Sequence, residues 1–229
     1  MKPGRPLYIY EEIMLLALSD KKGTVHSGAF YALAIGGAIV AQLLLAGAIV
    51  VREEKNKKFI EPAKRVDFGD PLLDECLELI RTAKRRATVK RWVTAFARIR
   101  RLRQRVVTQL CDRGILKADQ DKVLLVFTRK IYPERDPRPE REIIARMRQA
   151  IFRHTSTVDA ETAVLVALAN GAGLLRAVFD RKKLKERKQR IKQIVEGNLI
   201  GDATREVVQA TQAAVMAAAA AVTAATAAR

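Results

Sequence analysis

The chain has 229 residues, of which 49% are hydrophobic, and its 43 Lys and Arg outnumber its 25 Asp and Glu to give a net charge of +18. This length and hydrophobic fraction exclude a disordered protein and suffice for a buried core. The excess of positive charge predicts an anionic partner: nucleic acid, an acidic membrane surface or an acidic protein. Cys76 and Cys111 lack a metal-binding or redox spacing. They are expected to be small buried residues in a reducing cytosol.

The chain opens with a predicted helix over Leu7–Leu18, followed by an uncharged run, Gly23–Val51, that is long enough to cross a membrane. Polar residues and four glycines interrupt this run. A helix over Tyr31–Leu45 that ends at Gly47 is therefore favoured over a membrane span, which stays the alternative. The second uncharged run, Val207–Ala228, is mostly alanine and is predicted to be a buried C-terminal helix.

A helix followed by a β-hairpin is predicted twice. After Gly47, the apolar segment Ile49–Val51, a polar tip and Phe59–Ile60 are typical of a hairpin. The same order returns after Gly114, where the polar tip Lys117–Lys122 precedes an apolar run. This run is predicted to form a strand and consists of Val123, Leu124, Leu125, Val126 and Phe127.

Helices are predicted for most of the remaining chain. Thr88 is expected to cap the helix that follows it, and Gly171-Ala172-Gly173 to allow close packing inside a helix. The other predicted helices are Leu72–Ala87, Glu140–His154, Asp159–Phe179 and Lys182–Val195. The predicted class is therefore mainly α, with a short tail over residues 1–6 and a single globular helical domain over residues 7–229 that carries two short β-hairpins.

The segment Leu79–Cys111 has no acidic residue but eleven basic ones. Like charges on a helix repel, so an anion from outside the segment is expected to balance them. At about 100° per residue, Arg103 falls within the apolar stripe of a helix and Arg100 falls at the border of that stripe. An arginine on a buried face must be paired, reach solvent or line an anion pocket. Asp112 and Glu142 are the carboxylates that would satisfy this pair in a purely structural role.

The residues indicate no enzyme chemistry. His26 and His154 are the only histidines, and no spacing typical of metal ligands or of a phosphate-binding loop is present. Asp70 and Asp74 are expected at the start of a helix, where they favour the helix dipole. We therefore expect no catalytic residue, no cofactor and no metal.

Several motifs resemble, in order, those of the Golgi phosphoprotein 3 family. The resemblance extends from about Leu7 to Ala228 and rests on five segments: Glu11–Leu18, Gly69–Glu75, Thr88–Val93, Ile99–Val106 and Arg113–Leu116. It implies a mostly helical peripheral membrane protein that binds phosphatidylinositol 4-phosphate on the cytoplasmic leaflet. It also implies an anionic phospholipid membrane as partner, and an adaptor role towards membrane enzymes or their tails. Residence on the Golgi is implied only for a eukaryotic member, and the alanine and arginine content favours a bacterial one.

The resemblance also implies site residues. The family's two headgroup arginines, three positions apart, match Arg100 and Arg103. Its membrane-inserting hairpin matches Lys117–Phe127, with the run from Val123 to Phe127 as the apolar wedge or as a surface for self-association. Ser27 and Gly36 stand where the family has a tryptophan and an arginine, so half of that lipid site differs here.

A nucleic-acid-binding protein of the winged-helix kind is the alternative, because helix-then-hairpin units combined with high positive charge are typical of that class. The helix Tyr31–Leu45 has no basic residue with which to bind phosphate. Nucleic acid is therefore the less favoured partner, and the membrane is the expected one.

Overall fold

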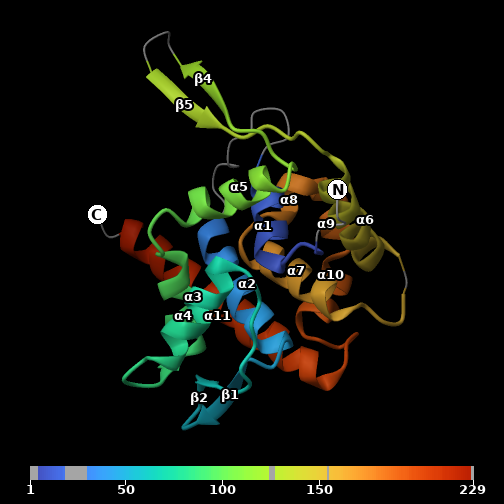
Figure 1. The fold of residues 1–229 in the computed structure, drawn as a ribbon. Coiled ribbons are helices and arrows are strands. Elements are labelled where there is room, and N and C mark those ends of the chain that lie inside the picture. Colours follow the sequence, from blue (N-terminus) through green and yellow to red (C-terminus); the bar gives the residue numbers. More distant parts are fainter. Residues whose placement is uncertain (1–4, 19–29, 124–126, 154, 228–229) are drawn as a thin grey trace.

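A computed structural model describes residues 5–18, 30–123, 127–153 and 155–227, and its mainly helical fold confirms the predicted class (Figure 1). The helices are α1 (Ile9–Ala17), α2 (Tyr31–Leu45), α3 (Pro71–Arg81), α4 (Val89–Ala97), α5 (Leu102–Asp112), α6 (Arg138–Phe152), α7 (Ala160–Gly171), α8 (Leu175–Val178), α9 (Arg181–Glu186), α10 (Lys188–Val195) and α11 (Asp202–Ala227). The strands are β1 (Ile49–Glu54), β2 (Lys57–Pro62), β3 (Ala87–Thr88), β4 (Asp119–Val123) and β5 (Phe127–Ile131).

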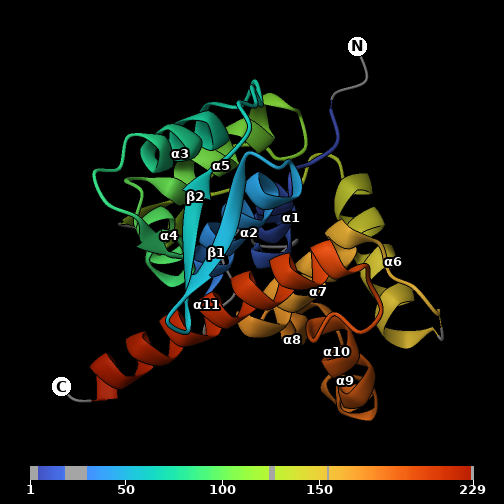
Figure 2. The same cartoon turned by 90° about the horizontal axis from the view of Figure 1, so that it is seen from below.

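Helix α2 forms the centre of the core. It packs against α1, α4, α7 and α11, and every residue from Leu33 to Leu43 is buried (Figures 1 and 2). The bounds of this helix are those predicted, and its apolar composition is explained by the burial of Leu33–Leu43.

Helix α11 runs along the underside of the molecule, and its last turns extend beyond the body (Figure 2). Val208 and Val215 are fully buried, whereas residues 220–225 are exposed. The predicted buried helix is thus confirmed for the first part only. Within the described chain, Thr204–Ala225 is the one helix long and apolar enough to cross a bilayer, and 44% of its apolar window is buried.

The first hairpin is longer than predicted, because its charged tip belongs to the strands. Glu53 pairs with Lys58 and Glu54 with Lys57, which places opposite charges across the ladder. Only Lys55 and Asn56 form the turn, with φ of 49° and 60°, as tight hairpin turns require. β3 adds a third strand beside β2.

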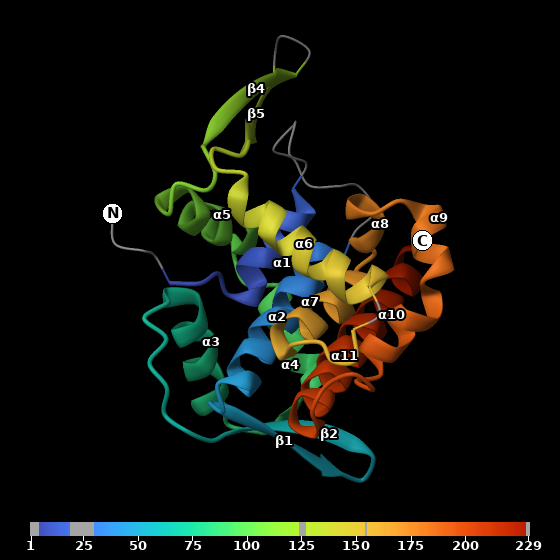
Figure 3. The ribbon, with the colours of Figure 1, turned by 90° about the vertical axis from the view of Figure 1, so that its right-hand side faces the viewer.

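The second hairpin projects from the end of the molecule opposite β1 and β2 (Figures 1 and 3). The predicted single strand from Val123 to Phe127 is wrong, because β4 ends at Val123, β5 begins at Phe127 and these two residues pair with each other. Five apolar residues in a row gave no signal for a chain reversal. Leu124, Leu125 and Val126 lie outside the described residues.

Other predicted helices are shorter than the pattern suggested. The helix predicted over Leu72–Ala87 ends at Arg81, before the sheet strand β3. That predicted over Asp159–Phe179 ends at Gly171, and Gly173 has a left-handed φ of +76° that interrupts the helix before α8. Thr88 caps α4 as predicted, since its hydroxyl oxygen accepts a hydrogen bond from the backbone N–H of Arg91.

Helices α2 and α4 approach each other closely at Gly36. A Cβ atom at this position would lie 2.3 Å from the backbone oxygen of Val93, well inside contact distance. A Cβ atom at the neighbouring Gly37 would instead meet the side-chain ends of Val215 and Leu168, at 2.7 and 2.9 Å. Gly36 is therefore required by the close approach of two backbones. Gly37 is less strictly required, because the side chains that face it can shift.

Two buried carboxylates of α1 fix the helices around it. The fully buried Glu11 pairs with Arg5 at 2.6 Å and with Arg113, at the end of α5, at 3.1 Å. Its oxygen also accepts a hydrogen bond from the backbone N–H of Tyr8, which closes the start of the helix. Glu12 pairs with Arg146 of α6.

Asp70 joins this polar core from α3. One oxygen accepts hydrogen bonds from the backbone N–H groups of Leu72 and Leu73, so the residue caps α3 as expected. The other accepts hydrogen bonds from the hydroxyl of Tyr10 at 2.7 Å and from the amide of Gln109 at 3.1 Å. The start of α3 is thereby tied to both α1 and α5.

We expect Gly36→Ala to destabilise the fold by about 1–3 kcal/mol, because an overpacked backbone contact outweighs the better helix propensity of alanine. Gly37→Ala is the matched control and should cost less, since the side chains facing it can move. Urea-induced unfolding of both variants measures the difference. Equal losses would contradict a backbone contact specific to Gly36.

Burial raises the pKa of Glu12 to about 7, although the Arg146 guanidinium lowers it. The folded protein thus retains a proton between about pH 4.5 and 7 that the unfolded chain loses, so the free energy of unfolding should fall as pH rises through this window. Glu12→Gln should remove this pH dependence. The stability of the variant minus that of the native protein should therefore be larger at pH 8 than at pH 5, by on the order of 1–3 kcal/mol. Urea unfolding at both pH values measures it.

Arg146→Gln provides the complementary variant. Without the guanidinium the pKa of Glu12 should rise further, which would extend the fall in stability to higher pH. A difference between Glu12→Gln and the native protein that is independent of pH would contradict the protonation of Glu12.

Candidate functional site

The junction between α4 and α5 presents several arginines at the start of a helix. α4 ends at Ala97, and α5 begins only at Leu102, because Arg101 adopts a left-handed φ of +57°. The prediction that one helix continues through Arg100 is therefore wrong. Arg100 precedes α5 and is exposed, so only Arg103 of this pair lies in the helix. A left-handed arginine costs of order 1–3 kcal/mol and gave no signal in the sequence.

The electrostatics of this helix start favour an anion. The N-terminus of a helix carries partial positive charge, and the first turn of α5 contains no acidic residue. Arg100, Arg101 and Arg103 therefore stand at the end of the helix where cations are unfavourable. An anion bound between these arginines and the backbone N–H groups would reduce the repulsion among the arginines and interact favourably with the helix dipole.

Arg103 links this helix start to the base of the second hairpin. Its guanidinium carbon lies 5.7 Å from the ring centroid of Tyr132, the residue directly after β5. The side chain is half-buried, and its Nε atom is buried without a hydrogen-bond partner. The contact with the Tyr132 ring orients the guanidinium of Arg103, whose terminal N–H groups form no hydrogen bond among the described residues.

The carboxylate partners expected for a structural arginine pair are not found among the described residues. Within the described part of the chain neither Arg100 nor Arg103 forms an ion pair, so Asp112 and Glu142 do not satisfy them. Of the eleven basic residues from Leu79 to Cys111, Arg86 pairs with Glu54 and Glu61, and Arg105 with Glu75. The other nine have no carboxylate partner among the described residues.

Position 36 cannot supply a further cation. The resemblance places an arginine where Gly36 stands, but the contact of this glycine with the backbone of α4 leaves no room for any side chain. Ser27, the other departure, lies outside the described residues. Trp92 packs against the core beside Phe96, with ring centroids 5.4 Å apart, as expected of a core residue.

The predicted hairpin wedge, Val123 to Phe127, lies partly outside the described residues. Val123 pairs with Phe127 where β4 ends and β5 begins, and the side chains of residues 120–130 are outside the described set. At the hairpin base Leu116 bridges Glu134, and Lys117 lies 3.7 Å from Asp119. Arg103 and the hairpin thus belong to one end of the molecule.

Both cysteine thiols are shifted away from the reactive form. Burial raises the pKa of the Cys76 and Cys111 thiols, which disfavours the thiolate form. No group of three or more His, Cys, Asp or Glu residues within the described ranges is arranged to hold a metal ion.

Comparison with known proteins identifies the family. The chain is 25% identical over 207 residues to vacuolar protein sorting-associated protein 74 of Eremothecium gossypii, a match that covers 76% of this chain and 61% of that protein. It is 28% identical over 151 residues to the protein of the same name from Schizosaccharomyces pombe, covering 57% of this chain and 44% of that one. The chain thus spans less than two thirds of the length of these relatives. The family model described as Golgi phosphoprotein 3 (GPP34) matches residues 9–211, so this chain belongs to the Golgi phosphoprotein 3 family.

Proposed function

We propose that this protein is a peripheral membrane protein that binds phosphate-bearing anionic lipid headgroups, such as that of phosphatidylinositol 4-phosphate, on the cytoplasmic face of a membrane. The observation that supports it most is the position of Arg103, which lies without a carboxylate partner among the described residues and over the ring of Tyr132 at the hairpin base. A headgroup bound there would lie beside the hairpin that projects from the same end (Figure 1).

The charge distribution supports attachment through electrostatics. Each Lys or Arg near an anionic surface contributes about 1 kcal/mol of attraction. Charge-assisted contacts to a phosphate contribute on the order of 1.5–3 kcal/mol each. Because Gly36 replaces an arginine of the family pattern, we expect the site to require a phosphate group and to select weakly among lipids that carry one.

Two further roles follow from family membership and remain proposals. An adaptor could bring membrane enzymes, or their tails, to the surface that it binds. The apolar end of the second hairpin, Leu124 to Val126 in sequence, could insert into lipid or contact a second copy of the chain.

Nucleic acid is less well supported as the partner. In a winged-helix protein the helix before the wing exposes a face to the DNA groove. The helix before the first hairpin is α2, whose residues Leu33–Leu43 are all buried in the core. Duplex DNA nevertheless serves as a competitor in the membrane-binding test below.

We expect Arg100→Ala combined with Arg103→Ala to weaken binding to liposomes that contain phosphatidylinositol 4-phosphate by about tenfold or more. Flotation with phosphatidylcholine liposomes, with and without the anionic lipid, measures this. Arg85→Ala combined with Lys90→Ala is the matched control. It removes the same charge from exposed residues next to β3, beside the opposite hairpin, and should have a smaller effect.

Equal losses from the two double variants would indicate diffuse attraction without a site at α5. Displacement of the native protein from liposomes by duplex DNA at equimolar phosphate would favour nucleic acid instead.

We expect Leu124→Ser combined with Val126→Ser to reduce liposome binding if these two residues face lipid, with Leu125→Ser and Phe127→Ser as the complementary pair. Leu79→Ser changes a 45% exposed leucine of α3 and serves as the control, with no expected effect. If neither double variant alters flotation while circular dichroism shows an intact fold, attachment is electrostatic and the hairpin does not insert.

A further inference from the structure

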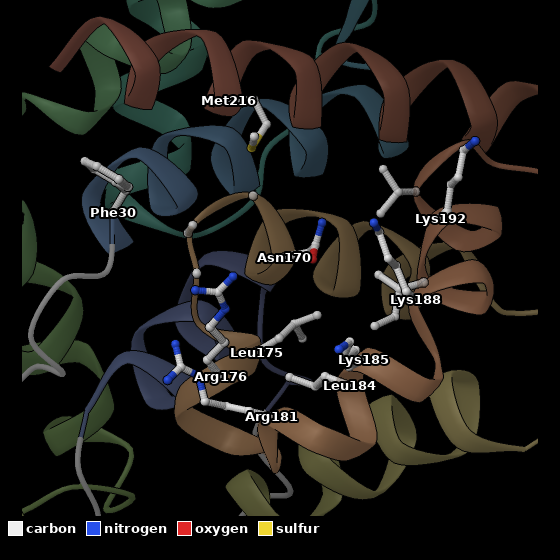
Figure 4. Close-up of a pocket in the computed structure, with 15 residues that line it drawn as sticks. Phe30, Asn170, Leu175, Arg176, Arg181, Leu184, Lys185, Lys188, Lys192 and Met216 are labelled. Carbon is white, nitrogen blue, oxygen red and sulfur yellow. The ribbon is translucent and has the colours of Figure 1, made fainter. Parts of the chain in front are cut away.

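A second basic site lies on different helices. A cavity of about 780 Å³ opens between the end of α7, the short helices α8, α9 and α10, and the middle of α11 (Figure 4). None of the residues that carry the proposed headgroup site lines it. Its volume falls within the range of small-molecule sites, about 300–1,000 Å³.

Two helix interruptions create this cavity. A continuous helix through Gly171-Ala172-Gly173 would run straight past α11, but the left-handed Gly173 ends α7 and turns the chain into α8. A second break at Arg187 separates α9 from α10. The chain therefore bends around an open space that α10 and α11 close on the far side.

The inner wall of the cavity is apolar. Leu175 and Ile191 are buried, Leu184 and Val195 are half-buried, and all four line the space. Met216 of α11 also lines it and is 47% exposed, one of the most exposed large hydrophobic residues described. An adaptable, exposed methionine above an apolar wall is typical of a surface that an apolar ligand covers.

The rim of the cavity is basic. Figure 4 shows Arg176 and Arg181 on one side and Lys188 and Lys192 on the other, with Lys185 below and the amide of Asn170 between them. Lys192 lies 3.6 Å from Glu196. Arg176, Arg181, Lys185 and Lys188 have no carboxylate partner in the described part of the chain. Among the residues that the structure describes, no acidic side chain lines the cavity, so the charge of its described lining is complementary to an anion.

We propose that this cavity binds a single-chain anionic lipid, with the acyl chain along the apolar wall and its terminal phosphate or carboxylate between Arg176 and Arg181. Two guanidinium groups provide several N–H donors for one anionic group. The apolar wall gains free energy from each methylene that it removes from water.

Other occupants fit less well. An α-helix with its side chains is about 10–12 Å across and would bury only a fraction of its surface in this space. Inorganic phosphate alone would satisfy the arginines but leave the apolar wall and Met216 exposed to water. A chain with one anionic end satisfies both parts of the cavity.

Calorimetric titration of the whole 229-residue chain with dodecyl phosphate, below the critical micelle concentration of this ligand, tests the proposal. We expect saturable binding to one site, and binding at least about tenfold weaker for dodecyltrimethylammonium, which has the same chain and the opposite charge. Inorganic phosphate should also bind at least about tenfold more weakly, because it lacks the chain. Dodecanoate distinguishes a carboxylate from a phosphate headgroup. Equal binding of the anionic and cationic amphiphiles, or no binding of dodecyl phosphate, would overturn the proposal.

Variants locate the site. Arg176→Gln combined with Arg181→Gln should weaken dodecyl phosphate binding by about tenfold or more. Lys182→Gln combined with Lys183→Gln removes the same charge from α9, outside the cavity lining, and should change binding less than about twofold. Leu184→Trp fills the cavity and should weaken binding without changing charge. Equal losses from the two charge variants would overturn the site.

The experiments can contradict the cavity proposal without contradicting the proposed headgroup site, and the reverse also holds. Monomeric dodecyl phosphate requires no membrane, and its tightest binding should persist in Arg100→Ala with Arg103→Ala, because the headgroup site offers the phosphate no apolar wall for the chain. Displacement of dodecyl phosphate by an acidic amphipathic peptide that binds more tightly would assign the cavity to a protein partner. Loss of self-association in Leu184→Trp by sedimentation would assign it to a second copy, and either result would overturn the lipid proposal.

Discussion

The arrangement of the helices depends on supplying partners to two adjacent buried carboxylates of α1. A buried carboxylate is tolerated only with charged or hydrogen-bonded partners, and removal of one partner is strongly destabilising. Glu11 obtains its partners from the N-terminal segment and from the end of α5, through Arg5 and Arg113. Glu12 obtains its partner from α6. Three parts of the chain are therefore fixed relative to α1 by charge, in addition to apolar packing.

This constraint also positions the candidate headgroup site. Arg113 and Gln109 attach the C-terminal half of α5 to the carboxylates of α1 and α3. With that half fixed, the helix start at Leu102 has one orientation, and Arg103 lies over Tyr132. The buried polar residues thus hold in place the exposed ones proposed to bind lipid. This role explains why the segment Glu11–Leu18 contains acidic residues. The sequence pattern identified the segment but gave no reason for their presence.

Periodicity predicted the buried elements well and the interruptions poorly. The bounds of α2 follow from its apolar composition and terminal glycine, and the cap at Thr88 follows from its position before a helix. The left-handed Arg101 left no mark in the sequence, because arginine does not normally adopt that conformation. Gly173 was visible as a glycine, but a pattern of apolar residues continues on both sides of it. Some ion-pair partners are far apart in sequence. Glu12 and Arg146 are separated by 134 positions, and no sequence pattern links them.

The close contact of α2 with α4 has a consequence for how lipid selectivity could change. An arginine at position 36 cannot be introduced by a single substitution, because the backbone oxygen of Val93 occupies the space of its Cβ atom. Helix α4 would first have to move outward, and α11 packs against both helices and would have to follow. If the proposed headgroup site is correct, substitutions that alter its preference are therefore accessible on the exposed junction between α4 and α5, and inaccessible along the interior of the helix pair. In this chain, evolution or design could thus change the proposed lipid site only through residues of that junction.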